Sequence, residues 1–211
     1  GQQVTAGQEV VCDGKKVESG KQRPILLMVN KPRGIVCTTS DKDRAENIVE
    51  FLNYPVRVYP VGRLDKDSEG LLLMTNQGDL VNRIMRAGNF HEKEYEVQVD
   101  REITPEFLKK MASGVNILDT VTRPCRVEKT GRDSFRIILT QGLNRQIRRM
   151  CQALGYQVTK LKRVRIMNLR WDSLKTGEYR MVTKEEEKEL KRLLRGSSSE
   201  PGKARTARKR G

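Results

Sequence analysis

The sequence predicts an α+β fold built on a mixed, mainly antiparallel sheet. Apolar runs of strand length recur along the chain and are separated by turn signals. Helical spacing of apolar residues is confined to a few segments, and these do not alternate strictly with the strands. Because parallel neighbours need a crossover connection, usually a helix, this irregular order favours antiparallel neighbours.

The first half of the body is expected to supply strands and one short helix. The consecutive apolar residues Ile25–Val29 are typical of a buried strand. A turn at Lys31–Gly34 then leads into a second extended segment, Ile35–Thr39. Asn47–Leu52 predicts a short helix, and the apolar run Leu71–Met74 predicts the next strand.

The second half carries clearer helix boundaries. Thr104 before a first-turn proline is an N-cap signal, Gly155 is a good C-terminal cap, and Thr183 with Glu186 makes a capping box. The expected elements are, in order, a helix around 80–85, a strand at 95–99, a helix at 104–113, a strand at 135–140, a helix at 144–154, a strand at 160–165 and a final helix from 183.

The charge balance predicts a polyanionic partner. The 211 residues include 42 Lys and Arg against 27 Asp and Glu, a formal net charge of +15. A ribosomal RNA, an anionic membrane surface or a histone-like tail would fit this excess. Aromatic residues make up only 5% of the chain, so broad base stacking on an aromatic sheet is not expected.

The length predicts one medium domain, residues 25–195, with an extension at each end. Residues 1–24 contain a hairpin signal but too few apolar residues to fold alone, and they resemble the end of an S4-type RNA-binding domain. Residues 196–211 are expected to form a basic disordered tail. From Arg195 onward six basic residues and one acid give +5, which leaves +10 on the rest.

Cysteine and histidine usage disfavours a metal centre. Cys12, Cys37, Cys125 and Cys151 form no CxxC pair, and His91 is the only histidine. Isolated cysteines are typical of buried thiols in a reducing cytosol, and we expect a cytoplasmic protein. No apolar stretch approaches the roughly 18 residues that span a bilayer, so no membrane partner is expected.

A charged loop before the strand at 71–74 is the strongest candidate for chemistry. Asp65 lies between Arg63 and Lys66, next to a rigid element, as a nucleophile or base would. Asp65, Asp67 and Glu69 could instead bind metal for phosphodiester cleavage, or the loop could be merely solvated. The interleaved cations would repel a metal ion, which weighs against the nuclease interpretation.

The helix expected at 144–154 carries three arginines of different orientation. Its apolar stripe consists of Ile147, Met150, Cys151 and Leu154. Arg148 borders this stripe, Arg149 points away from it and Arg145 is intermediate. An arginine at the margin of a buried face needs an anionic partner, and Asp65 is a candidate for it. Alternatively, all three arginines could simply coat a solvent-exposed face.

A basic stretch includes the same helix and continues beyond it. Residues 142–170 contain eight Lys and Arg and no acid, which suits contact with backbone phosphates. The residues expected to bind RNA are Lys31, Arg145, Arg149, Lys160, Lys162, Arg163 and Arg165.

Four segments in a fixed order carry a family resemblance. These are Asn30–Gly34, Gly62–Asn76, Lys93–Tyr95 and Gln141–Met150. Together they resemble the motifs of the RNA pseudouridine synthases, in the branch that acts on the small and large ribosomal subunits. The resemblance extends through 25–194, and it implies a long curved sheet with flanking helices and a central catalytic cleft.

The resemblance also implies roles for individual residues. Asp65 would act as nucleophile or as ribose base, and Arg148 would pair with it. Arg63 would fill the space left by the flipped uridine, and Tyr95 would stack on the uracil. The reaction, which isomerises uridine to pseudouridine, would use no cofactor and no metal.

Three interpretations of the chain therefore remain open apart from the nuclease. The first is an isomerase, expected to be a monomer, acting on large-subunit (23S) ribosomal RNA. The second is the same isomerase acting on a transfer RNA. The third is a non-catalytic RNA-binding protein of ribosome assembly.

Overall fold

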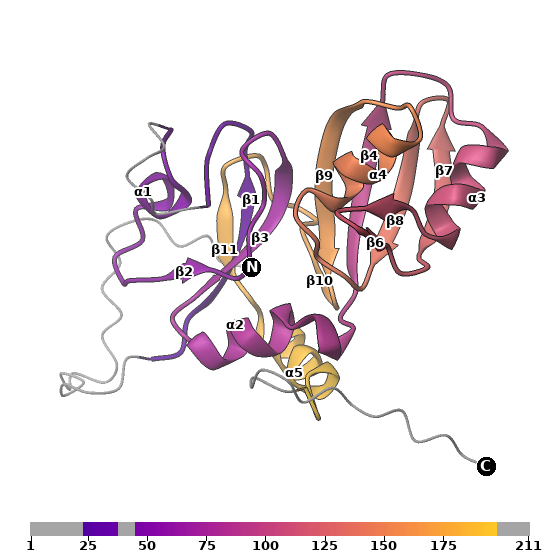
Figure 1. Ribbon diagram of the computed structural model, residues 1–211. Helices are drawn as coiled ribbons and strands as arrows, with labels where there is room; N and C mark the ends of the chain where they lie inside the picture. Colours follow the sequence, from indigo (N-terminus) through magenta and orange to yellow (C-terminus); the bar gives the residue numbers. More distant parts are fainter. Residues whose placement is uncertain (1–22, 38–44, 198–211) are drawn as a thin grey trace, which may run out of the picture.

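The computed structural model describes residues 23–37 and 45–197 (Figure 1). The S4-like segment expected before residue 25 and the tail expected after 195 lie almost entirely outside these residues. The strands are β1 (Leu26–Lys31), β2 (Tyr59–Pro60), β3 (Glu69–Thr75), β4 (Lys93–Val99), β5 (Asn116–Ile117), β6 (Thr120–Val121), β7 (Arg126–Gly131), β8 (Ser134–Leu139), β9 (Val158–Ile166), β10 (Leu169–Arg170) and β11 (Tyr179–Met181). The helices are α1 (Ile48–Leu52), α2 (Gly78–Met85), the 3-10 turn η1 (Ala87–Asn89), α3 (Pro105–Ser113), α4 (Gln146–Ala153) and α5 (Lys184–Leu193).

The strands confirm the predicted α+β fold with a mixed, mainly antiparallel sheet. Nine strands form one sheet in the order β11-β1-β3-β9-β4-β8-β7, with β2 added to β3 and β10 to β9. Among the strand pairs of the described residues, only β3–β9 is parallel. It divides the sheet into a first half, β11-β1-β3, and a second half, β9-β4-β8-β7, which Figure 1 shows on either side of the centre.

The two halves meet through a very short parallel ladder. Its partners are Glu69 with Lys162 and Gly70 with Arg163. Gly70 has φ +106°, and a Cβ added there would lie 2.2 Å from the backbone oxygen of Arg163. Only glycine tolerates both the left-handed backbone and this approach. The sequence therefore brings the charged loop before β3 directly beside the middle of β9.

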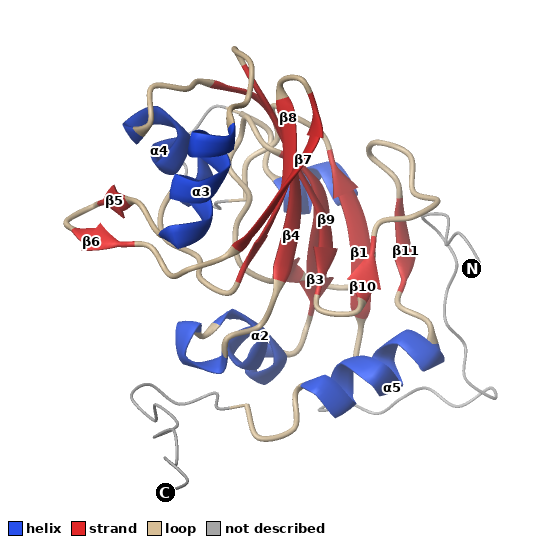
Figure 2. Ribbon diagram, turned by 90° about the vertical axis from the view of Figure 1, so that its right-hand side faces the viewer, coloured by secondary structure: helices blue, strands red, loops and turns tan. Residues whose placement is uncertain are grey.

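The cores explain the apolar patterns of the sequence. On β1 and β3 alternate residues pack to opposite faces, so both strands are buried on both sides and their sequences are continuously apolar. Helices α2 and α5 cover one of these faces and α1 the other. Helices α3 and α4 cover the second half, and Figure 2 shows them together beside β7 and β8.

Several predicted boundaries are confirmed, and one strand is not. Thr104 caps α3, and Thr183 with Glu186 forms the predicted capping box of α5. Gly155 has φ +83°, as its place after α4 requires. The predicted strand at 35–39 is wrong for the part that is described, since Val36 makes only an isolated bridge; residues 38 and 39 lie outside the described ranges.

The short strands β5, β6, β10 and β11 were not predicted, because strands of two or three residues carry too little periodicity to detect. Within the described ranges, no helix is long and apolar enough to cross a membrane.

Candidate active site

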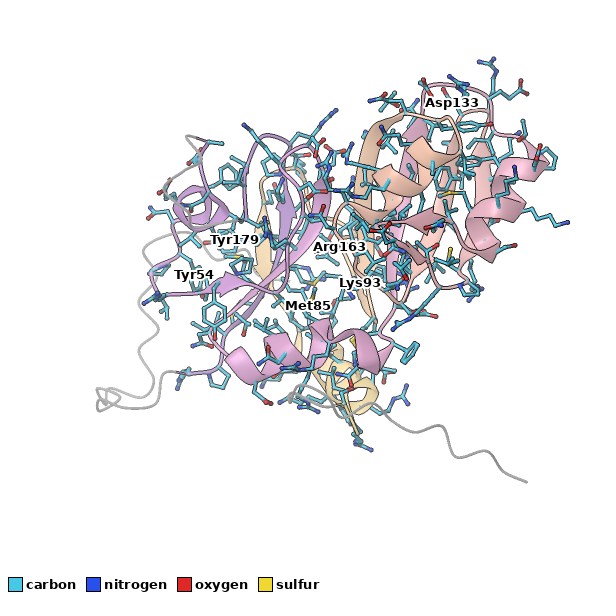
Figure 3. The ribbon with its side chains drawn as sticks, viewed as in Figure 1. Tyr54, Met85, Lys93, Asp133, Arg163 and Tyr179 are labelled. Atoms are coloured by element: carbon cyan, nitrogen blue, oxygen red, sulfur yellow. The ribbon has the colours of Figure 1, made fainter. Side chains whose placement is uncertain are left out.

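A cavity of about 400 Å³ lies where the two halves of the sheet meet. Its wall is built by the loop before β3, by the start of β4, by the middle of β9 and by the N-terminal end of α4. Figure 3 places Arg163, Lys93 and Met85 near this junction. The predicted residues Arg63, Asp65 and Tyr95 all line the cavity, and so does Arg145.

The loop that carries Asp65 is fixed by main-chain bonds. The N–H of Ser68 donates to the Asp65 carbonyl at 3.0 Å, and the N–H of Gly34 donates to the Lys66 carbonyl at 2.7 Å. The N–H of Leu64 donates to the Cys37 sulfur at 3.4 Å. These bonds position the Asp65 side chain, of which about a third is exposed, before any ligand is present.

Lys31 supports this loop and does not face RNA. Its side chain is fully buried, and its Nζ donates to the carbonyls of Pro32 at 2.9 Å and Ser68 at 2.8 Å. Burial lowers the pKa of Lys31, while nearby acids oppose that shift. The prediction of Lys31 as an RNA-binding residue is therefore wrong, because an inward-facing lysine cannot reach a phosphate.

The predicted ion pair between Arg148 and Asp65 is replaced by a different pairing. Arg145 Nη1 lies 3.5 Å from Asp65, and the same guanidinium donates to both carboxylate oxygens of Asp67 at 3.1 and 3.0 Å. These bonds lower the pKa of the Asp67 carboxyl. We call Asp65, Asp67, Arg145 and Arg148 the rim of the cavity.

Arg148 braces the loop from behind. Its Nη2 donates to the Asp67 carbonyl and to Ser68 Oγ, both at 3.1 Å, and its Nη1 lies 3.4 Å from the Asp67 carboxylate. The side chain is 14% exposed, so its expected place in partly desolvated surroundings is confirmed. Arg145 was underrated because it stands outside the helix, as an N-cap residue with φ 48°. A helical projection cannot place a residue with that backbone.

The basic stretch is divided between surface and interior. Arg163 is 2% exposed, and its Nε donates to the Leu71 carbonyl at 2.8 Å. Arg165 is held by the carboxylates of Glu92 and Glu94 and by the carbonyl of Met167. The prediction that Arg163 and Arg165 bind phosphates is therefore wrong. Both lie on β9, near the centre of the sheet, and both side chains are largely buried.

The remaining predicted RNA-binding residues keep accessible positions. Lys160 is 55% exposed and lies 3.5 Å from Glu69. Lys162 places its Nζ 3.5 Å from the centre of the Trp171 ring. Arg149 is bonded to Asn144 at the edge of the cavity. These residues stay predictions as phosphate contacts.

Lys93 is a cavity residue whose importance the sequence did not reveal. It is 6% exposed, and burial together with the charge of Arg163 lowers its pKa to about 8. Lys93 lies on the same face of β4 as Tyr95, two residues later. The alternation along this strand is the only sequence signal that could have indicated an inward-pointing Lys93. We call Lys93 and Arg163, the most buried charged side chains of the cavity, its floor.

The carboxylates of the loop are each matched with a cation. Asp65 and Asp67 share Arg145, and Glu69 lies beside Lys160. In the described part of the chain, no group of three or more potential ligand residues is arranged to hold a metal ion. Asp65 is the only acid among the described residues that line the cavity, against four cations.

Comparison with known proteins gives consistent matches. Residues 25–153 match the family model described as RNA pseudouridylate synthase. The dual-specificity RNA pseudouridine synthase RluF of Salmonella typhi is 54% identical over 95% of this chain and 69% of its own length. Ribosomal large subunit pseudouridine synthase B of Bacillus subtilis is 34% identical over 92% of this chain and 81% of its own.

The solved structures agree with the sequences. A crystal structure of a pseudouridylate synthase superposes with a TM-score of 0.74 and 30% identity. The match covers 82% of this chain and 75% of that one. The fold implied by the four motifs is thereby confirmed.

Proposed function

Because the chain belongs to the RNA pseudouridine synthase family, and so isomerises uridine to pseudouridine in RNA, we propose that Asp65 is its catalytic residue. The observation that carries this proposal is the isolation of Asp65 as the one carboxylate lining the cavity within the described residues. Its loop is held by main-chain bonds, which favours a fixed orientation.

The reaction detaches uracil from its ribose, rotates it and rejoins it through carbon. Asp65 acts on the ribose, either by attacking C1′ or by taking a proton. Arg145, 3.5 Å away, forms an ion pair that orients the carboxylate. Arg148 contributes indirectly by bracing Asp67 and Ser68. This division of labour modifies the direct Arg148–Asp65 pair expected from the sequence.

Arg63 and Tyr95 stabilise the flipped-out conformation of the nucleotide. Arg63 is exposed beside the catalytic loop and can enter the space that the uridine vacates, since flipping costs a few kcal/mol. Tyr95 is partly buried on β4 and offers its ring to the uracil. Both assignments are supported by the presence of these side chains in the cavity wall.

The substrate we propose is large-subunit (23S) ribosomal RNA. The Bacillus subtilis relative, which is named for the ribosomal large subunit, supports this class of substrate. The description of the RluF relatives as dual-specificity enzymes supports a second RNA, for which a transfer RNA is the candidate. The basic surface supplies affinity through phosphates, with Arg149, Lys160 and Lys162 as contacts. We propose that the protein acts as a monomer in the cytoplasm, without metal or cofactor.

Tritium release tests the activity and the catalytic residue together. Ribosomal RNA tritiated at uracil C5 is incubated with the protein and a chelator, and released tritium is measured. We expect release from intact RNA, and we expect Asp65→Asn to lower the rate by about 1,000-fold or more while preserving RNA affinity.

Asp67→Asn is the matched control for this experiment. Asp67 is also in the loop, but it lies outside the residues that line the cavity, so its substitution should be much milder. The reverse ranking would mean that the wrong carboxylate had been chosen. Tight binding with no release by the wild-type protein would favour the non-catalytic assembly protein, and chelator-sensitive cleavage would favour a nuclease.

A further inference from the structure

The cavity floor carries two positive charges that no described residue neutralises. Lys93 Nζ has neither a hydrogen bond nor an ion pair with any described residue, although the side chain is almost completely buried. Arg163 uses its Nε on the Leu71 carbonyl, but its Nη2 is buried without a partner. Unpaired buried donors cost free energy, so such an arrangement indicates a ligand group that completes it.

The depth of the floor indicates which part of the substrate it meets. The phosphates of a flipped nucleotide stay joined to the RNA chain and must remain near the surface. The exposed cations Arg63 and Arg145 lie where they could contact these phosphates. The base is the part that can reach the bottom of the pocket, so Lys93 and Arg163 face the base and not the backbone.

We propose that Lys93, together with the free Nη2 of Arg163, donates hydrogen bonds to a carbonyl oxygen of the flipped uracil and stabilises the uracil anion released during the reaction. This inference rests on the isomerase activity and the cavity proposed above. Lysine and arginine are donors only, and uracil offers carbonyl oxygens as acceptors.

The electron balance explains why a cation is useful at this position. When the N1–C1′ bond breaks, its electron pair leaves with N1 and spreads onto the ring carbonyl oxygens. C5 then bonds to C1′, the C5 proton is lost, and N1 takes up a proton, so that the product is an isomer. Negative charge develops on the ring only as the bond breaks, and a fixed cation therefore stabilises the transition state more than the bound substrate.

The other charged groups near the cavity are less suited than Lys93 and Arg163 to stabilise the uracil anion. Asp65 is engaged by Arg145 at 3.5 Å, and His91, two residues before Lys93, is itself held less basic by burial and by Lys93. The charged or titratable side chains that line the cavity with Lys93 are Arg63, Asp65, Tyr95, Arg145 and Arg163. Because the pKa of Lys93 is lowered to about 8, free protein loses this charge as pH rises through that value, and kcat/KM should fall there.

Substitution of Lys93 on two substrates tests the proposal. Lys93→Met keeps the length of the side chain without its charge, and Lys93→Gln keeps a donor without charge. Lys109→Met, at an exposed position on α3, is the control. Single-turnover conversion, RNA affinity and Tm are measured, first with an unmodified transcript and then with one containing 5-fluorouridine, by loss of the substrate nucleoside in digests.

We expect Lys93→Met to slow conversion by about 100-fold, the usual effect of removing one donor from a developing negative charge. RNA affinity should change by less than about three-fold, because the floor meets a single base and not the backbone. The alkaline fall of kcat/KM should disappear. The loss should be smaller with 5-fluorouridine, whose ring is a more acidic leaving group and needs less stabilisation.

Four results would overturn the role of Lys93. These are conversion close to the wild-type rate, a loss confined to RNA affinity, an equal loss on both transcripts, and a lowered Tm in both Lys93 variants, which would make the residue structural. A wild-type protein that converts neither transcript would instead reject the proposed activity. The two failures are thus distinguishable.

Discussion

The rim and the floor of the cavity treat their charges in opposite ways. At the rim, Asp67 is matched with Arg145 and Arg148, and Asp65 with Arg145. At the floor, Lys93 and Arg163 lie together without an acid among the described residues. Charged side chains that form ion pairs within the protein fix the conformation of a loop. Charged side chains that stay unpaired in the interior are available to bind a ligand. Substitutions in the two regions can separate these two uses.

Removing the contact between the two regions should have the largest effect on stability. The two acids of the rim lie in the loop before β3, whereas the floor lies on β4 and β9. Gly70 lets β3 approach β9. Gly70→Ala adds a Cβ 2.2 Å from the Arg163 carbonyl at φ +106°, and we expect it to lower the free energy of unfolding by about 3 kcal/mol. Urea denaturation measures this change.

Gly88→Ala is the control for that substitution, since nothing lies within 4 Å of the Cβ it would add. Equal stability of the two alanine variants would show that the halves do not depend on a close approach at Gly70.

Arg148→Ala tests the paired rim. It removes the donors to the Asp67 carbonyl and to Ser68 Oγ, and we expect a loss of about 1–3 kcal/mol in the free energy of unfolding. The rate of isomerisation should also fall, because the loop loses its brace. Arg148→Lys should rescue part of the stability but less of the rate, since lysine lacks the planar fork.

Thermal melts and single-turnover rates together check this prediction. An unchanged Tm together with a large loss of rate would indicate that Arg148 directly contacts the substrate or Asp65.

Lys93→Met tests the unpaired floor through stability. A lysine whose pKa falls from 10.5 to about 8 on folding opposes folding while it is charged. At pH 7 its removal should therefore raise the free energy of unfolding, by about 1–3 kcal/mol. Between pH 8 and 10.5 the unfolded wild-type chain binds more protons than the folded one, so wild-type stability rises with pH in this window.

The advantage of Lys93→Met should accordingly shrink as pH rises from 8 to 10.5. Urea unfolding at several pH values measures it, with Lys109→Met as the exposed control. A variant less stable than wild type at pH 7 would mean that the ammonium has a partner in the folded protein.

Arg149→Ala should have the smallest effect. Within the described residues, the hydrogen bonds of the Arg149 side chain go to Asn144, so its loss should spare stability. We expect RNA affinity to fall about three-fold and the salt dependence of binding to weaken by about one phosphate contact. Filter binding at several salt concentrations measures both. Unaltered affinity and salt dependence would remove Arg149 from the RNA surface.

Features that depend on neighbouring residues could be predicted from the sequence alone. The caps of α3 and α5 and the glycine after α4 were predictable because each signal and its hydrogen-bonding partner lie within a few residues. The buried strands β1 and β3 were predicted from their runs of apolar residues. The order of the four motifs was sufficient for the family and for the placement of Asp65, Arg63 and Tyr95 in one cavity.

Which charged side chains contact one another depends on the assembled fold and could not be predicted. Asp65 and Arg145 are distant in the sequence, and their contact depends on the parallel junction of β3 with β9 and on the left-handed backbone of Arg145. The burial of Lys31, Lys93 and Arg163 is likewise a property of the assembled sheet. Periodicity predicts which side of a helix or strand a residue faces. The residues that cover that side come from elsewhere in the chain, and these residues determine whether a cation contacts water, a carboxylate or the substrate.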